Sequence, residues 1–424
     1  MLFDWKGTCM RAYVYLKIFL KWAVLSAVTG IICGFTGSVF YYCVKSAIAF
    51  REGHSWMLYL LPLSGVLIVW LYRICGMKDD TGTNMILSSI RSSQKVPLKM
   101  APLIFVSTVL THLCGGSSGR EGAALQIGGS IGSFLGRTFK MDEKDIHIIT
   151  MCGMSAVFSA LFGTPMTAVL FSMEVVSVGI IYYVAFVPCM ISSLIAYGIA
   201  LWSGIRPATY VLAGIPALSV KSVFQMMVMG GLCALCGMLF CVLMHVGHEL
   251  YQHYLKNPYI RILVGAGLVI VLTLLAGCYD YNSAGVEVIG RALKGYARPE
   301  AFLLKILFTV VTLQAGFKGG EIVPTFFIGS TFGNVVGRLI GLSPSFGAGV
   351  GLIAVFCAVV NCPIASMMLS IELFGAEALP LFGTACGVSY MLSGYYSLYS
   401  SQKIVYSKLH PTYVNAKTTY AKKK

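Results

Sequence analysis

The stretch that decides the fold is Cys114-Gly115-Gly116-Ser117-Ser118-Gly119-Arg120-Glu121-Gly122, followed by an apolar run from Ala123 to Leu135. Four glycines and two serines disfavour a regular helix, whereas the uncharged run after them has the length of one. We therefore predict an irregular turn and then a helix that begins near Gly122. The unpaired N–H groups of its first turn would face the glycine turn, and such a helix N-terminus is a ready anion site.

Glu121 lies at this predicted helix start, between two apolar stretches. A charged side chain at membrane depth costs about 3 kcal/mol or more unless it is paired, so acids in such segments are usually functional. We expect the Glu121 carboxylate to occupy the anion site itself and to be displaced when an anion arrives. The alternative is a glutamate that only caps its helix or pairs with Arg120, which we would favour in a soluble protein.

The composition indicates an integral membrane protein and disfavours a soluble enzyme. The chain is 57% hydrophobic and 11% charged, with a mean hydropathy of +0.80. Its net charge is +15, and many basic residues cluster at the two ends, so the positive-inside bias predicts cytoplasmic termini without any need for nucleic-acid binding. The first uncharged stretch, Trp22–Val44, is too long for a cleavable signal. The cysteines lie mostly in apolar runs, so we expect packing residues and no disulfide framework.

Apolar segments of helical length recur along the chain and predict a polytopic helical protein. In the first half they are Trp22–Val44, Met57–Tyr72, the short Met85–Ile90, Lys99–Leu113, Ile148–Phe162, Pro165–Ile181 and Tyr182–Leu201. In the second half they are Val220–His253, Ile260–Cys278, Phe302–Gly316 and a helix from Thr325 that follows another glycine turn.

The two halves repeat one plan. The segment Gly153–Pro165 aligns with Gly351–Pro363 at a constant offset of 198 residues, and the match extends to Glu174 over Glu372. Both halves also carry a glycine turn in front of a helix. Two similar halves, each with a broken helix at the same place, are typical of transporters built from structural repeats.

Four motifs carry a resemblance to the CLC family of anion channels and anion/proton antiporters. They are Gly119-Arg120-Glu121-Gly122, the turn from Gly320 to Pro324, the turn at Gly82, and Leu398-Tyr399-Ser400. The resemblance implies an all-α polytopic membrane fold of two inverted-topology repeats, about residues 14–204 and 218–407, whose broken helices meet at a central anion site. It also implies a homodimer. Residues 408–424 are then a short basic cytoplasmic tail, and we expect no cytoplasmic regulatory domain within residues 1–424.

The resemblance assigns roles to individual residues. Glu121 matches the gating glutamate and would also carry the proton, Tyr399 matches the central tyrosine, and Thr83 takes the place of the central serine. Glu321 is expected to contribute to transport coupling; the alternative is a glutamate that is locked to Lys318 or Arg120 and only holds its turn. The expected anion-binding residues are Thr83, Asn84, Met85, Gly122, Ile322, Val323 and Tyr399.

The departures from chloride-type members point to the fluoride-exporting branch. This chain has Thr83-Asn84 where they have Ser-Gly, Ala123 where they have proline, and Glu321 in place of an apolar residue. Where proton-coupled chloride exchangers carry a second, inward-facing acid, this chain has Val175. Fluoride is small and strongly hydrated, so its site needs many hydrogen-bond donors, and Thr83, Asn84 and Tyr399 can supply them.

We therefore predict a fluoride/proton antiporter of the plasma membrane, with fluoride, protons and membrane lipid as partners and no metal, cofactor or nucleic acid. The alternatives are a CLC chloride/proton exchanger, a passive anion channel and an intramembrane enzyme, although the chain has no His-Glu-x-x-His or Gly-x-Ser-x-Gly motif. Three further features have competing interpretations. For His245, His248, Glu249 and His253 we favour a helix end that meets water over a metal site; Cys233 and Cys236 are expected to be packing residues; and the equivalent Glu174 and Glu372 are expected to be structural at their helix ends.

Overall fold

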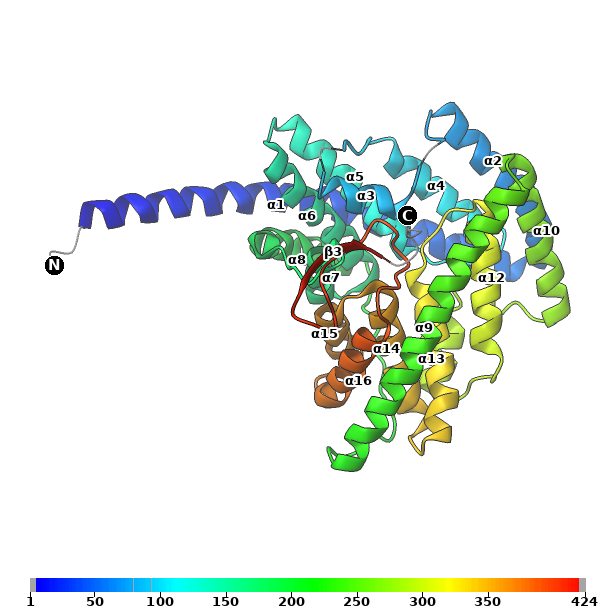
Figure 1. The fold of residues 1–424 in the computed structure, drawn as a ribbon. Coiled ribbons are helices and arrows are strands. Elements are labelled where there is room, and N and C mark those ends of the chain that lie inside the picture. The colour runs from blue at the N-terminus through cyan, green and yellow to red at the C-terminus, as the bar shows by residue number, and fades with distance from the viewer. Residues whose placement is uncertain (1–4, 79, 93, 419–424) are drawn as a thin grey trace.

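A computed structural model describes residues 5–78, 80–92 and 94–418. Helices α1 to α8 form the first half of the described chain and α9 to α16 the second (Figure 1). The first half contains α1 (Trp5–Gly53), the 3₁₀ turn η1 (Ser55–Leu60), α2 (Leu61–Ile74), α3 (Thr83–Ser89), α4 (Met100–Leu113), α5 (Glu121–Thr138), α6 (Glu143–Phe162), α7 (Pro165–Glu174), strand β1 (Ser177–Val178), η2 (Tyr183–Ala185) and α8 (Phe186–Trp202).

The second half follows the same order. It contains α9 (Val220–Tyr254), α10 (Pro258–Ala276), α11 (Val286–Leu293), α12 (Ala301–Ala315), α13 (Ile322–Leu339), α14 (Pro344–Val360), α15 (Pro363–Phe374), α16 (Leu379–Leu392), and strands β2 (Lys403–Tyr406) and β3 (Tyr413–Lys417). Among the described residues, six helical segments are long and apolar enough to cross a membrane. The polytopic helical fold predicted from the sequence is therefore confirmed.

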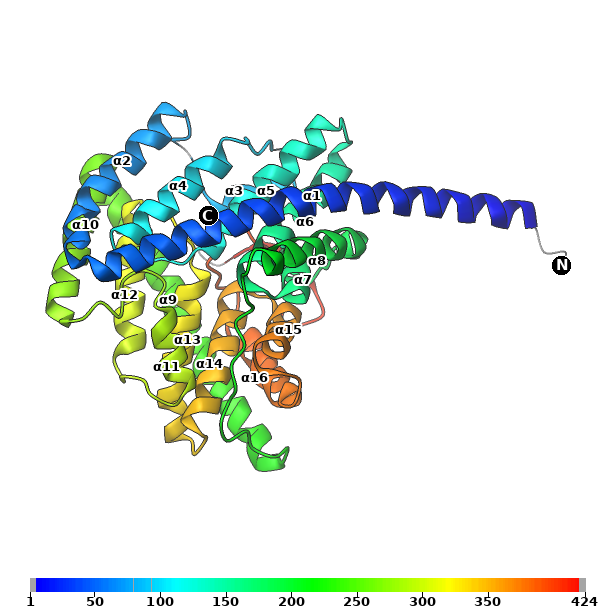
Figure 2. The same cartoon turned by 180° about the vertical axis from the view of Figure 1, so that it is seen from behind.

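Helix α1 is longer than a bilayer needs. Its 49 residues span about 70 Å at 1.5 Å per residue. The C-terminal part of α1 packs on α4, α6 and α8, whereas its N-terminal end projects away from the body (Figure 2). Apolar side chains between Met10 and Leu20 are accordingly exposed in the single chain.

Glycines set the closest helix packing in both halves. In the first half Gly128 of α5 lies against Gly153 of α6, where an added Cβ would come within 2.1 Å of a backbone oxygen. In the second half Gly329 of α13 meets Gly351 of α14 in the same way, at 2.5 Å. The two contacts correspond to each other, because the repeat alignment places Gly153 over Gly351. Because α6 and α14 are buried on nearly all sides, they form the centre of each half.

Two glutamates each cap a helix of the opposite half. Glu372 of α15 accepts hydrogen bonds from the Met166 and Thr167 amides at the start of α7, both at 2.9 Å. Glu174 of α7 accepts from two amides at the start of α15, at 3.2 and 2.9 Å. Each acid thus satisfies orphan N–H groups of the other half, which agrees with the structural role predicted for the pair.

The structure differs from the sequence predictions in three segments. Helix α7 ends at Glu174, seven residues before the predicted Ile181, because β1 pairs in parallel with β2. Helix α13 begins at Ile322, three residues earlier than predicted, since Pro324 is tolerated in a first helical turn. Part of the predicted basic tail forms β3, which pairs antiparallel with β2. Residues 419–424 of that tail lie outside the described residues.

Candidate functional site

The glycine turns of the two halves meet at the centre of the protein. Gly119 and Gly320 form an antiparallel bridge, in which each amide donates to the other's carbonyl oxygen at 2.6 and 2.7 Å. This bridge places the start of α5 beside the start of α13. An added Cβ on Gly320 would lie 2.4 Å from the Gly122 nitrogen, so only glycine permits this approach.

Glu121 is fully buried at the first position of α5, as the sequence predicts. Its Oε2 accepts a hydrogen bond from the Arg120 amide at 2.9 Å, and its Oε1 lies 3.5 Å from Arg120 Nε. Oε1 has no hydrogen-bond partner, although the Val323 amide faces the same carboxylate from the start of α13. The carboxylate therefore lies where the dipole of α13 would favour an anion.

Arg120 closes one side of the Glu121 carboxylate. Its guanidinium stacks 4.7 Å from the centre of the Tyr41 ring, and about a fifth of its side chain is exposed. The ion pair expected from the alternative interpretation of Glu121 thus exists, although its shortest N–O distance is 3.5 Å.

Glu321 is the N-cap residue of α13 and lies close to Gly122. An added Cβ on Gly122 would come within 3.1 Å of Glu321 Oε2 and 3.4 Å of Thr83 Oγ1. Glu321 Oε2 is buried without a hydrogen-bond partner. Lys318, one of the alternative partners of Glu321, instead forms an ion pair with Asp80. Two acids and a hydroxyl group therefore gather around Gly122.

Tyr399 is buried, and its hydroxyl group has no hydrogen-bond partner. The Tyr399 hydroxyl group lies close enough to the Glu321 and Glu121 carboxyl groups for their charges to act on it. Its backbone is held by the Gln402 amide at 3.0 Å and the Thr418 hydroxyl at 3.2 Å, which donate to the Tyr399 carbonyl oxygen. Gln402 and Thr418, on either side of strands β2 and β3, thus hold the turn that contains Tyr399 (the tyrosine turn) in place.

Helix α3 joins the tyrosine turn to the first half. Asn84 Oδ1 accepts from the Ser401 amide at 2.9 Å, and the Arg91 guanidinium donates to the Ser401 carbonyl oxygen. The Met85 amide donates to the Gly82 carbonyl oxygen at 3.0 Å, so this N–H group is already engaged. Ile322 and Val323 occupy the first turn of α13, where amides lack intrahelical partners. The predicted site residues thus lie at the starts of three helices, α3, α5 and α13, and in the turn that contains Tyr399.

Sequence reasoning missed Gln126 and His112. Gln126 Nε2 donates to Thr83 Oγ1 at 3.3 Å, and His112 Nε2 lies 3.3 Å from the Gly119 carbonyl oxygen. Gln126 could have been found as the only amide side chain in the apolar run from Ala123 to Leu135. His112 gave no such signal, because its burial beside Gly119 depends on long-range packing.

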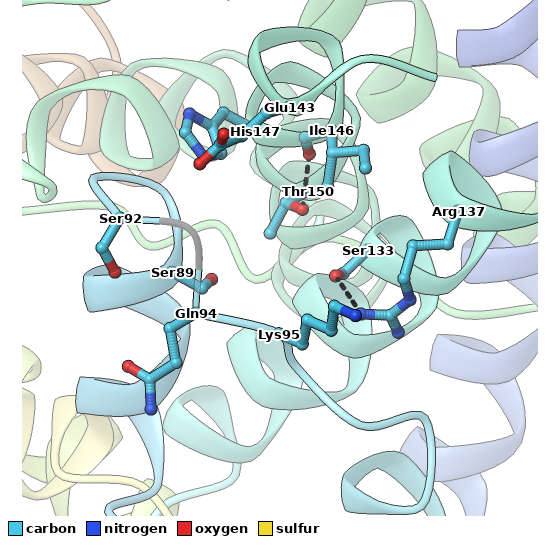
Figure 3. A pocket seen from close by; sticks show the side chains of 10 residues that line it. All are labelled: Ser89, Ser92, Gln94, Lys95, Ser133, Arg137, Glu143, Ile146, His147 and Thr150. Carbon is cyan, nitrogen blue, oxygen red and sulfur yellow. Dashed lines mark hydrogen bonds between the residues drawn. The ribbon is translucent and has the colours of Figure 1, made fainter. Parts of the chain in front are cut away.

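Other candidate positions lie apart from this site. His248 Nδ1 lies 3.2 Å from Gln314 Oε1, and no cluster of three or more potential metal-ligating side chains is found among the described residues. Val175 is the C-cap residue of α7, and its carbonyl oxygen accepts from Gln402. A pocket of about 240 Å³ opens at the far end of α5, where Ser133, Arg137 and His147 line it (Figure 3). It is about 20 Å along α5 from Glu121 and is not part of the site.

Comparisons with known proteins show the family of this chain. The family model described as voltage gated chloride channel matches residues 64–394. A chloride/fluoride channel protein of Pseudomonas syringae pv. tomato is 34% identical over 92% of this chain and 88% of its own. An H(+)/Cl(−) exchange transporter of Vibrio cholerae is 25% identical over 70% of this chain and 67% of its own.

Solved structures share the fold. The crystal structure of a CLC-type fluoride/proton antiporter matches with a TM-score of 0.87 at 31% identity, covering 90% of this chain and 98% of that one. A slow cyanobacterial Cl−/H+ antiporter matches with a TM-score of 0.75 at 18% identity, covering 88% and 94% of the two chains, which shows a common fold alone. The chain therefore belongs to the voltage-gated chloride channel (CLC) family and has its fold of two inverted repeats.

Proposed function

We propose that this chain is a fluoride/proton antiporter that exports fluoride across the plasma membrane. The observation that carries the proposal is the meeting of Glu121, Glu321 and Thr83 around Gly122, at the facing starts of α5 and α13. The likeness to a CLC-type fluoride/proton antiporter, at 31% identity over most of both chains, supports the same function.

Glu121 acts as gate and proton carrier in this proposal. Its carboxylate faces the first amides of α13 and so stands in for an anion. When the carboxyl group takes up a proton it loses its charge, and the pull of the helix dipole on it weakens. An anion can then replace it, which couples the movement of a proton to the movement of the anion.

The remaining site residues would replace the water shell of fluoride. The Tyr399 hydroxyl group is a donor without a partner, and the Thr83 hydroxyl group is engaged only by a long contact of 3.4 Å with the Gly122 carbonyl oxygen. The Asn84 side-chain amide, whose Oδ1 accepts from Ser401, and the first amides of α5 and α13, including Gly122, Ile322 and Val323, complete the set. Met85 would line the site with its side chain and would not donate through its amide, because that amide already donates to the Gly82 carbonyl oxygen. Such a dense set of donors suits a small, strongly hydrated anion.

Glu321 contributes to the coupling. Its buried, unpartnered Oε2 lies beside Gly122, within reach of the space that a departing anion or the Glu121 side chain would cross. A carboxylate there repels an anion, whereas a carboxyl group can donate to one, so the protonation of Glu321 would decide whether an anion passes.

The proposal includes a homodimer with both termini in the cytoplasm. The basic residues near the two ends support this orientation under the positive-inside bias. Exposed apolar side chains on α8 and α16, including Leu194, Trp202 and Leu392, need cover from lipid or from a second subunit.

The test is fluoride efflux, chloride efflux and proton movement from proteoliposomes that contain the purified protein, with Glu321→Gln beside the wild type at equal dimer yield. The proposal requires that the wild type prefers fluoride and that the variant loses coupled transport. Wild-type preference for chloride would indicate a chloride/proton exchanger, and fluoride flux without proton movement would indicate a passive channel. Normal transport by Glu321→Gln would leave this residue a structural role only.

A further inference from the structure

An ion pair ties together the two turns that carry the site. Lys318 Nζ lies 2.9 Å from Asp80 Oδ2, although the two residues are 238 positions apart in the chain. Asp80 is three residues before Thr83, and Lys318 is three residues before Glu321. The pair therefore spans the two halves at equivalent distances from two site residues.

Asp80 uses both of its carboxylate oxygens. Oδ2 accepts from Lys318, while Oδ1 accepts from the Gly82 amide at 3.1 Å. The Asp80 side chain is 1% exposed, and Lys318 also stacks 4.3 Å from the centre of the Tyr72 ring. Removing Lys318 would therefore leave the buried charge of Asp80 without its ion-pair partner.

Gly82 is the point at which Asp80 acts on Thr83. Its φ of +62° is a conformation that favours glycine, and its amide is fixed by Asp80. Thr83 follows at once as the first residue of α3. The orientation of the Gly82 turn thus sets where the Thr83 hydroxyl group lies.

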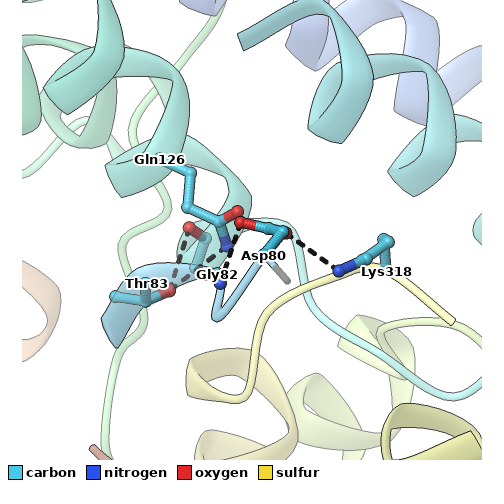
Figure 4. A network of polar contacts seen from close by, with 6 residues as sticks. Asp80, Gly82, Thr83, Gln126 and Lys318 are labelled. Atoms are coloured by element: carbon cyan, nitrogen blue, oxygen red, sulfur yellow. Dashed lines mark hydrogen bonds and ion pairs between the residues drawn. The ribbon is translucent and has the colours of Figure 1, made fainter. Parts of the chain in front are cut away.

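The Thr83 hydroxyl group is held only weakly from its other side. It accepts from Gln126 Nε2 at 3.3 Å (Figure 4) and donates to the Gly122 carbonyl oxygen at 3.4 Å. Because an O–H···O contact of 3.4 Å is long and therefore weak, an anion can replace the Gly122 oxygen as the acceptor of the Thr83 proton. Small shifts of the Gly82 turn would therefore change the distance from this donor to the ion.

We propose that Asp80 and Lys318 are positioning residues for anion selectivity, because their ion pair fixes the distance between the Thr83 hydroxyl group and the Glu321 carboxylate. The inference rests on the proposed function, since it assigns Thr83 and Glu321 to the transport site. Neither charged residue touches the ion itself. The pair acts by holding the two glycine turns at one separation, which matters most for an anion as small as fluoride.

The experiment measures the apparent KM and the maximal rate of fluoride efflux from proteoliposomes for Asp80→Asn and Lys318→Gln. Asparagine keeps an oxygen for the Gly82 amide and removes only the charge. We expect the apparent KM for fluoride to rise by about tenfold and the preference over chloride to fall, with proton coupling kept at saturating fluoride. Lys318→Arg keeps the ion pair and should stay within about twofold of the wild type.

Controls separate positioning from folding. Asp280→Asn removes a more exposed ion pair, between Asp280 and Arg291 of α11 (2.6 Å), and should leave KM unchanged. The double variant Asp80→Asn/Lys318→Gln should have a KM no higher than the worse single variant, because both changes break one interaction. The proposal would be overturned if the KM increases of the two single variants multiplied in the double variant. It would also be overturned if the single variants lost thermal stability but kept the wild-type KM and selectivity.

The anion preference of the wild type tests the proposed function, whereas the KM of the variants tests the ion pair. If the wild type prefers chloride, the fluoride assignment fails, but the same KM comparison made with chloride still tests the ion pair. Lys318→Gln alone suffices if Asp80→Asn does not fold, because the Lys318 side chain is 23% exposed and tolerates truncation better than a fully buried one.

Discussion

Gly122→Ala tests the geometry of the site with a single methyl group. The new Cβ would lie 2.9 Å from the Gly320 Cα, 3.1 Å from Glu321 Oε2 and 3.4 Å from Thr83 Oγ1. The first distance is too short for any Cβ, so the backbones of the two turns must separate, and the Glu321 carboxylate must move by a few tenths of an ångström.

The cost to stability is small, because two effects oppose each other. Alanine in place of glycine within a helix gains about 1 kcal/mol, and overpacking a tight contact costs about 1–3 kcal/mol. The expected net loss in unfolding free energy is therefore about 0–2 kcal/mol, and Gly122→Ala should fold. Transport is more sensitive, since a shift well below 1 Å in reacting groups can cost about tenfold or more in rate.

The assay is fluoride efflux from proteoliposomes, followed with a fluoride electrode, at equal amounts of folded protein. The matched control is Gly267→Ala in α10, where an added Cβ meets nothing within 4 Å. We expect Gly267→Ala to transport as the wild type does and Gly122→Ala to lose at least about nine-tenths of the rate. Wild-type efflux by a folded Gly122→Ala protein would refute the reasoning that Glu321 and Thr83 meet at a functional site.

Three further substitutions separate coupling from structure. Glu121→Gln keeps the shape but cannot carry a proton, so fluoride-driven proton pumping should vanish; pumping at the wild-type rate would contradict the role of Glu121. Val175→Ala should keep proton coupling and lose only about 1–2 kcal/mol of stability, whereas loss of coupling in folded protein would mean that a relay does pass this position. Glu372→Gln, which weakens the cap on α7, should lower the melting temperature by an amount equivalent to about 0.5–2 kcal/mol and leave the fluoride KM unchanged; a shifted KM would give Glu372 a role in transport.

Local chemistry made the site predictable from the sequence. The glycine turns at Gly119 and Gly320 each precede an apolar run of helical length, and an acid stands at the start of each. A glycine-rich turn, a helix start and an acid within an apolar stretch can each be recognised from a few neighbouring residues. For this reason the sequence pattern alone indicates both acids, and they lie at the first position of α5 (Glu121) and at the N-cap of α13 (Glu321).

Long-range pairing could not be predicted in the same way. The residues after Glu174 are apolar like a helix, yet Ser177 and Val178 form a strand because residues 403–404 lie beside them. The Asp80–Lys318 ion pair likewise joins two distant loops, and nothing in the sequence around either residue indicates that the other is its partner. Hydrophobic periodicity reports on the burial of one element, and it carries no information about which distant element covers it.

The most direct test of the central claim is proton movement driven by a fluoride gradient in proteoliposomes that contain only the wild-type protein. We predict that fluoride running down its gradient moves protons against theirs, and that an equal chloride gradient moves far fewer. Fluoride flux with no accompanying proton movement, or stronger pumping with chloride than with fluoride, would contradict the account.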